Sequence, residues 1–302
     1  MNRQSPKRFT LAILSLALLL ASFNAAEAQR KRSTKEETTT VGSPVNAILD
    51  LGSSMLNSAT SYVDVDPYSQ FREQQYSNEG LLSERDEIKL GNTIHLEVQK
   101  RYKIVADGQA RLNRIGQRIA RASRRPGLAY QFHVIRDKEL NAFSTPGGHI
   151  YVTTALMDIA SDDQLSSVLA HEVGHVVARH SLKTLQQTQM LGGIADLIGS
   201  VTGIAGDTAQ QLGTLAAQLV GSGLLSVHNR EEEREADFLG VHTMAKAGYD
   251  TEAMISMFQK ILNVGERDSS LLNELFSDHP AVQERIDNTR YEIDHMRNSR
   301  RR

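Results

Sequence analysis

The chain has 302 residues, of which 40% are hydrophobic and 23% are charged, and its formal net charge is −2. This is the composition of a globular protein with room for a core, and it shows none of the basic excess of nucleic-acid-binding proteins. No cysteine is present, which excludes disulfides and an N-terminal lipid carried on a thiol. We therefore expect a globular chain that is not a lipoprotein and has no nucleic-acid partner.

The first 28 residues have the pattern of a cleavable signal peptide. Lys7 and Arg8 precede an apolar run over 11–20, and Ala26-Glu27-Ala28 has the small-residue pattern of a cleavage site. The apolar run is shorter than the roughly 20 residues that a membrane span requires. We expect residues 1–28 to be removed during export.

The rest of the chain divides into three parts. Residues 29–79 form an N-terminal segment or linker without sustained periodicity, with one short helix around 45–56. We place the main domain at 80–296 and a basic tail at 297–302.

Helices and a small sheet are predicted in the first half of that domain. Helical patterns run over 83–102 and again after Asp107, where apolar residues recur every three or four positions. Alternating residues over 130–134 predict a strand. Two further short strands, over 141–145 and 149–153, are separated by a Pro-Gly-Gly turn.

A helix predicted after Ser161 carries the motif HEVGH in its middle. Ser161 and Gln164 form a capping box. Later helices are expected over 229–247, 251–264 and 281–296. Together these elements predict an α+β fold, mostly helical with a small sheet.

Residues 191–225 are rich in Gly, Ala, Leu and Ile, but Asp and Gln interrupt the run. A membrane span is therefore not expected. One interpretation is a pair of packed helices. The alternative is a mobile lid or a hairpin that makes peripheral contact with a membrane.

The HEVGH motif carries the chemistry. His171 and His175 are four residues apart and share one helix face, so their imidazoles can converge on one metal ion. Zinc is the natural occupant, at one ion per chain. Glu172 is placed to take a proton from an activated water, as a general base.

A catalytic zinc needs a third protein ligand. The metzincin pattern would require Gly at 178 and His at 181, but the chain has Ala178 and Ser181. A glutamate-rich run over 231–235 offers a carboxylate instead. Within it, Glu233 and Asp237 share a helix face, so one can bind zinc while the other orients a ligand histidine. Ala236 beside them would allow close helix approach.

At this point the chain resembles the zinc metallopeptidases that include the CAAX prenyl protease, the HtpX proteases and the periplasmic BepA-like enzymes. The resemblance covers roughly residues 80–296 and rests on four segments: NAFSTPGGHIYV, LAHEVGHVVARH, NREEEREADFLG and DHPAVQERI. It implies that Glu233 is the third ligand and Asp237 its supporting residue, with Glu232 or Glu235 as alternatives if the helix is rotated. We expect neither the long membrane spans nor the helical repeat domain found in some members.

Two further site predictions concern His279 and a substrate-binding strand. A histidine before proline, such as His279, is usually a helix cap. Its match to the family's HP motif implies a fourth ligand, or a switch that holds the enzyme latent. For substrate binding we expect an edge strand within 141–153, through a set of turn and strand residues: Asn141, Ala142, Phe143, Gly148, His149 and Tyr151. The remaining histidines are expected to be structural or exposed.

The signal peptide and the resemblance together predict a periplasmic zinc endopeptidase with a zincin-like metalloprotease domain. Its expected substrates are misfolded or stalled envelope proteins, in particular outer-membrane proteins or their assembly machinery. The alternative is a chaperone-like protein that binds unfolded strands and hydrolyses little.

Overall fold

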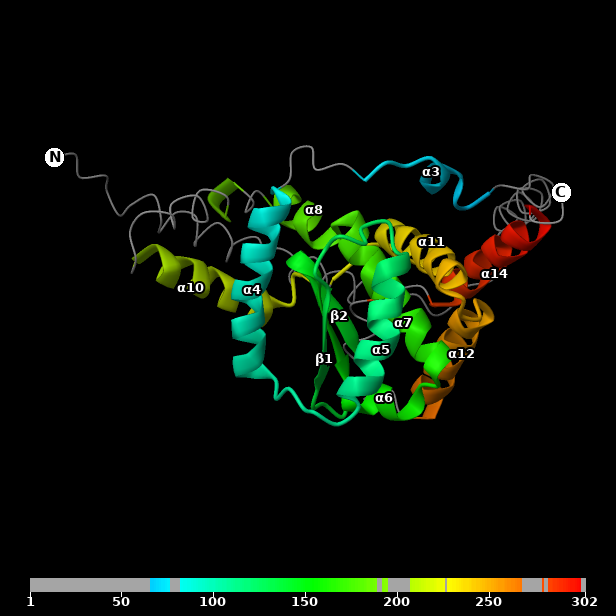
Figure 1. The fold of residues 1–302 in the computed structure, drawn as a ribbon, viewed down its shortest axis with the longest axis horizontal. Helices are drawn as coiled ribbons and strands as arrows, with labels where there is room; N and C mark the ends of the chain where they lie inside the picture. Colours follow the sequence, from blue (N-terminus) through cyan, green and yellow to red (C-terminus); the bar gives the residue numbers. More distant parts are fainter. Residues whose placement is uncertain are drawn as a thin grey trace, which may run out of the picture. The chain divides into compact units, whose positions relative to one another are not determined.

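The computed structural model describes residues 66–76, 82–188, 192–194, 207–225, 227–267, 279 and 282–299. The signal peptide, the short helix expected over 45–56 and Pro280 lie outside these residues. The described elements follow the predicted order (Figure 1): α3 (Ser69–Arg72), α4 (Glu84–Arg101), α5 (Gln109–Ala122), β1 (Gln131–Ile135), β2 (Ala142–Thr145), η1 (Pro146–Gly148), β3 (His149–Thr153), α6 (Thr154–Ile159), α7 (Asp162–Ala178), α8 (His180–Gln187), α10 (Asp207–Ser222), α11 (Arg230–Ala247), α12 (Glu252–Arg267) and α14 (Val282–Ser299). The fold is mostly helical with a small sheet, as predicted.

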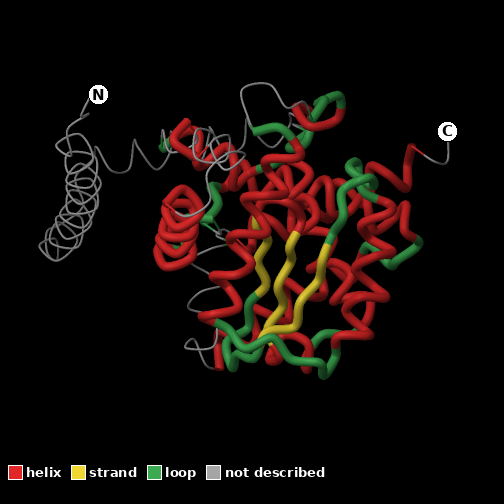
Figure 2. The backbone as a smooth tube through the Cα atoms, turned by 60° about the vertical axis from the view of Figure 1, so that its left-hand side comes forward, coloured by secondary structure: helices red, strands yellow, loops and turns green. Residues whose placement is uncertain are grey.

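The sheet has three strands in the order β1-β3-β2, which lie side by side among the helices in Figure 2. β1 pairs with β3 in parallel, and β2 pairs with β3 in an antiparallel hairpin. The hairpin turns at η1, where Gly147 and Gly148 have φ angles of 79° and 90°. L side chains rarely adopt such angles, so the glycines make this turn possible.

Each face of the sheet is covered by an apolar cluster. On one face the core joins Phe132, Ile150 and Val152 to apolar residues of α5, α7, α11, α12 and α14. On the other face Ile135 and Tyr151 pack against apolar residues of α4, α8 and α10. The strand β3 is buried at all five positions because it contributes side chains to both clusters.

The folded part begins earlier than the expected boundary at residue 80. Tyr68 and Phe71, which we placed in the linker, are 0% and 3% exposed and belong to the main core. Arg72 also donates two hydrogen bonds, of 2.9 and 2.8 Å, to the buried Glu292 carboxylate of α14. Residues 66–76 are therefore part of the domain. These residues carry no periodic signal in the sequence, because the helix α3 has only four residues.

The region around 207–225 contains a packed helix. Leu212, Ala216 and Leu219 of α10 are buried in the cluster that includes α4. Among the described residues, no helix is long and apolar enough to span a membrane. Residues 195–206 of the same Gly-rich stretch lie outside the description.

Candidate metal centre

The helix α7 positions both histidines of the HEVGH motif. It begins with the predicted capping box, in which Gln164 N–H donates to Ser161 Oγ and Ser161 N–H donates to Gln164 Oε1. The motif lies in the C-terminal half of this helix rather than in its middle, and His175 is in the last turn. His171 and His175 are both buried, and their Nε2 atoms are 2.9 Å apart. The two imidazoles therefore meet edge to edge, as the four-residue spacing predicted.

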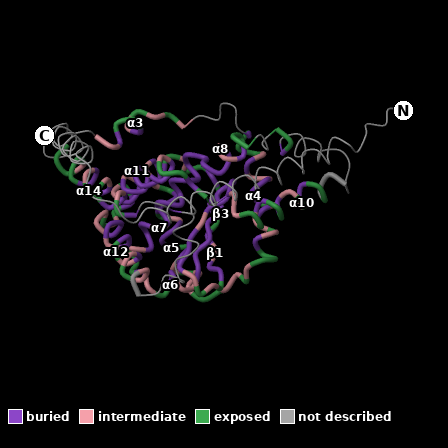
Figure 3. The backbone as a smooth tube through the Cα atoms, turned by 180° about the vertical axis from the view of Figure 1, so that it is seen from behind, coloured by how far each residue is buried: buried purple, intermediate pink, exposed green. Residues whose placement is uncertain are grey.

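The helix α11 crosses α7 and brings a carboxylate to the two histidines. The helices can approach closely because Gly174 faces Ala236, and a Cβ on Gly174 would lie 2.8 Å from the Ala236 carbonyl oxygen. Both helices are buried over most of their length (Figure 3). Glu233 Oε1 is 3.3 Å from His175 Nε2, and Glu233 Oε2 is 3.5 Å from His171 Nε2.

The neighbouring acidic residues have other partners. Asp237 Oδ1 is 2.9 Å from His171 Nδ1, on the side of the ring away from Glu233. Glu232 accepts a hydrogen bond from the Asn229 N–H at the start of α11, and Glu235 Oε2 is 2.9 Å from His180 Nε2. This geometry places Glu233, rather than Glu232 or Glu235, beside both motif histidines.

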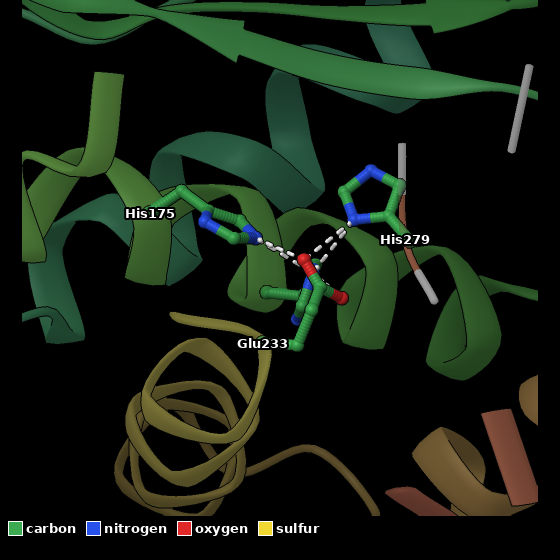
Figure 4. Close-up of side chains that lie close together, drawn as sticks. His175, Glu233 and His279 are labelled. Atoms are coloured by element: carbon green, nitrogen blue, oxygen red, sulfur yellow. Dashed lines mark hydrogen bonds and ion pairs between the residues drawn. The ribbon is translucent and has the colours of Figure 1, made fainter. Parts of the chain in front are cut away.

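His279 is a further member of the cluster. Its buried ring lies with Nδ1 3.0 Å from Glu233 Oε1 and 3.4 Å from His171 Nε2. Figure 4 shows the His175 and His279 rings reaching the Glu233 carboxylate from different sides. Burial opposes protonation of His279, but the carboxylates of Glu233 and Glu172 outweigh it and raise its pKa to about 9. The imidazole is therefore within reach of the fourth ligand position that the resemblance implies for His279.

Arg285 of α14 is a residue of the centre that we did not predict. Its guanidinium forms an ion pair with Glu233 Oε2, and its Nε donates a 2.8 Å hydrogen bond to Asp237 Oδ2. It also lies 4.5 Å from the centre of the Phe258 ring. Burial raises the pKa values of Glu233 and Asp237, but Arg285 outweighs this and holds both below their usual range. Both carboxylates are therefore anionic. The sequence signal was its place in DHPAVQERI, although nothing there indicated its target.

These residues fit a zinc ion. One nitrogen or oxygen atom from each of His171, His175, Glu233 and His279 lies within 4.8 Å of the others. Imidazole nitrogen and carboxylate oxygen are common zinc donors. Glu172 is 2% exposed, and its Oε2 has no hydrogen-bond partner within the described part of the chain. A buried carboxylate oxygen without a donor calls for an explanation, such as a catalytic role or a bound ion.

The histidines His95, His133 and His149 form a second cluster between α4 and the sheet. His133 Nε2 is 3.1 Å from His149 Nδ1, the two rings are within 14° of parallel, and their centres are 5.4 Å apart. The two nitrogens thus point at each other, as in a hydrogen bond. Burial lowers the pKa of His133 to about 4 and that of His149 to about 3. His95 of α4 stacks on both of these rings, and in this way the cluster holds α4 against the sheet.

The expected substrate-binding edge needs correction. His149 and Tyr151 belong to β3, which is the central strand, and Gly148 is buried in the turn η1. They are therefore not available to pair with a substrate strand. Of the described strands, β2 is at the edge of the sheet next to β3 and carries Ala142 and Phe143, with Asn141 just before it. The error arose because a hairpin in sequence does not show which of its strands the more distant β1 will pair with.

Two histidines from one helix and a glutamate from a crossing helix define the class of site, a candidate mononuclear metal centre of the metallopeptidase kind. The sequence profile of peptidase family M48 matches residues 106–293, which include all of these residues. The chain belongs to peptidase family M48.

Several relatives share this region. The mitochondrial metalloendopeptidase OMA1 of Schizosaccharomyces pombe is 31% identical over 176 residues, which are 58% of this chain and 50% of that protein. The beta-barrel assembly-enhancing protease of Escherichia coli is 28% identical over 193 residues, 62% of this chain and 39% of that protein. Metalloprotease LoiP of Escherichia coli is 32% identical over 166 residues, 54% of this chain and 63% of that protein.

The chain thus spans half or less of the length of the first two of these relatives. A solved structure, that of Ste24p from S. mikatae, matches with a TM-score of 0.38 and 18% identity over 67% of this chain and 55% of that chain.

Proposed function

We propose that the protein is a zinc-dependent endopeptidase whose metal ligands are His171, His175 and Glu233. The observation that carries this proposal is the convergence of the two Nε2 atoms and the Glu233 carboxylate, at 2.9 to 3.5 Å from one another, in a buried site. Membership of peptidase family M48 supports the same reading.

Each residue of the centre has a distinct part in this reaction. Zinc, when bound, supplies Lewis acidity, which activates water and polarises the scissile carbonyl. Glu172, directly after the ligand His171, accepts the proton of the attacking water and transfers it to the leaving amine. Asp237 accepts a hydrogen bond from His171 Nδ1 and so keeps Nε2 free for the metal. No covalent intermediate with the protein is needed.

His279 is proposed to regulate the site. Its ring lies 3.0 Å from Glu233 Oε1, and its Nε2 is 3.7 Å from Glu172 Oε1. In the fourth ligand position it would keep substrate and water from the metal. The enzyme would then be latent until His279 leaves.

The proposed substrates are misfolded or stalled proteins of the bacterial envelope, in particular outer-membrane proteins or their assembly machinery. Two observations support this: the signal-peptide pattern over 1–28, and the relative named a beta-barrel assembly-enhancing protease. The proposed location is the periplasm. Peripheral membrane contact through 191–225 belongs to the same proposal.

A chaperone-like role is the second candidate. An unfolded strand could pair with β2 at the edge of the sheet and be held without cleavage. The short distances from the buried His279 ring to Glu233 and Glu172, 3.0 and 3.7 Å, favour this candidate, because these contacts would hold the ring over the metal position.

The experiment that distinguishes the endopeptidase from the chaperone-like protein is degradation of an unfolded outer-membrane protein by the zinc-loaded chain and by Glu172→Gln. We expect the wild type to cleave and the variant to be slower by about a hundredfold or more, as for loss of a general base, while both bind one zinc. Zinc binding without cleavage by either protein would favour the chaperone-like role. Equal cleavage by both would rule out Glu172 as the base.

A further inference from the structure

The two motif histidines are held differently on the side away from the metal position. His171 Nδ1 meets a carboxylate directly, 2.9 Å from Asp237 Oδ1. His175 Nδ1 instead lies 2.7 Å from Nδ1 of a third histidine, His180. The ring centres of His175 and His180 are 4.9 Å apart, so the two nitrogens lie between the rings and point at each other. This contact has the geometry of a short hydrogen bond.

The hydrogen bond has only one consistent direction if His175 Nε2 binds a metal. A neutral imidazole carries its proton on one nitrogen, so a His175 ring that ligates through Nε2 donates from Nδ1. His180 must then accept at Nδ1 and carry its own proton on Nε2. That proton is directed at Glu235, whose Oε2 is 2.9 Å from His180 Nε2.

This series of hydrogen bonds, from His175 through His180 to Glu235, ends at residues from the N-terminal part of the domain and from α8. Glu235 Oε1 accepts a 2.8 Å hydrogen bond from Gln74 Nε2, and Lys183 Nζ is 3.6 Å from Glu235 Oε2. His180 is 0% exposed and Glu235 is 5% exposed. The carboxylate is therefore fixed from several sides, and it can hold His180 in one tautomer.

The contact between His175 and His180 depends on a turn of the backbone between α7 and α8. In a continuous helix, His180 would point about 140° away from His175, since each residue turns the helix by about 100°. The helix instead ends at Ala178, and the next residue, Arg179, has a φ of 57°, the one positive value for a non-glycine residue in the described ranges. Such a conformation is costly for a residue with a side chain, and it persists where the surroundings require it. Arg179 is itself paired with the buried Glu87, at 3.1 Å.

We propose that His180 and Glu235 form a positioning relay that orients His175 and fixes its tautomer for zinc binding. The relay gives His175 the support that Asp237 gives His171, with one extra imidazole between ligand and carboxylate. This inference rests on the proposed zinc site but not on its peptidase activity. A packed core histidine without this role would need neither the strained turn nor an acceptor at Nδ1.

The test is zinc affinity of the full chain, measured by competition with a chelator, for two substitutions at one position. His180→Leu fills the space but removes the acceptor, and we expect it to weaken zinc binding by about ten- to a hundredfold, as for other residues that support metal ligands. His180→Asn places Oδ1 close to the position of Nδ1 and keeps the acceptor. We expect it to bind zinc within a few-fold of wild type. Cobalt(II) in place of zinc should give an altered visible spectrum in His180→Leu alone.

His242→Leu is the matched control, because it removes a histidine that is likewise paired with a buried glutamate, 2.8 Å from Glu292, but far along α11 from the site. It should bind zinc as the wild type does. If His180→Leu does not fold, Glu235→Leu tests the same relay from its other end and should also weaken zinc binding.

Two results would overturn the relay: wild-type zinc affinity in folded His180→Leu, or equal weakening in His180→Leu and His180→Asn. Absence of zinc binding by the wild-type chain would remove the metal site and the relay together. Tight zinc binding without proteolysis by the wild type would remove the proposed function, while the affinity series would still decide on the relay.

Discussion

Arg285 balances the charge of the candidate metal centre. Its guanidinium contacts the Glu233 and Asp237 carboxylates at the same time, and all three groups are buried. Two anions so close together would repel each other without a cation between them. A buried charge that loses its partner is among the most destabilising of changes.

We expect Arg285→Met to lower the free energy of unfolding of the metal-free chain by about 3–5 kcal/mol, because it leaves two buried carboxylates uncompensated. Urea denaturation measures this directly. The control is Arg290→Met on the same helix, where an exposed ion pair with Asp287 contributes at most about 1 kcal/mol. A loss below about 1 kcal/mol for Arg285→Met would show that the carboxylates are protonated or otherwise compensated.

Among the elements, the crossing of α7 and α11 sets the geometry of the site. His171 and His175 come from one helix and Glu233 from the other, so the distance between the helices decides whether the three can share an ion. Gly174 lies at the closest approach, against the backbone of Ala236. A side chain there has no space without movement of a helix.

We expect Gly174→Ala to weaken zinc binding and to destabilise the fold by about 1–3 kcal/mol, the usual cost of overpacking. Gly213→Ala on α10 is the control, because a Cβ at that position meets nothing within 4 Å. Removing a glycine from a helix interior should stabilise the control by up to about 1 kcal/mol. Zinc titration and thermal unfolding of both variants test this. Unchanged zinc affinity in Gly174→Ala would mean that the metal site tolerates a larger distance between α7 and α11.

The sequence predicted these elements well where local signals exist. Ser83, Ser161 and Asn229 cap the three helices expected to start there, and Gly248 ends α11 in the left-handed conformation. The small Ala236 allows the close approach that we predicted. Contacts made by the tertiary fold had no such signal. The pairing of β1 with β3 and the turn at Arg179, which has no glycine to mark it, depend on packing between distant segments.

Across the whole domain, the sheet separates two apolar clusters, and the candidate metal centre lies among the helices of the larger one. Residues 66–76 close the domain by pairing Arg72 with Glu292 and Gln74 with Glu235. The first of these contacts holds α14, which carries Arg285, and the second reaches Glu235 of the proposed relay behind His175. The expected start at residue 80 would have left out both contacts, because Arg72 and Gln74 precede it. No local sequence signal indicates these contacts, because they join residues more than 150 positions apart in the chain.

The central claim is that one zinc ion binds to His171, His175 and Glu233, and the most direct test is to count zinc in two neighbouring glutamine variants of the full chain. After dialysis against a weak chelator, wild type and Glu232→Gln should each retain one zinc per chain, because Glu232 caps α11 and lies beside His228 rather than His171 or His175. Glu233→Gln should lose it. Retention of zinc by Glu233→Gln, or its loss from Glu232→Gln alone, would contradict the assignment of the third ligand.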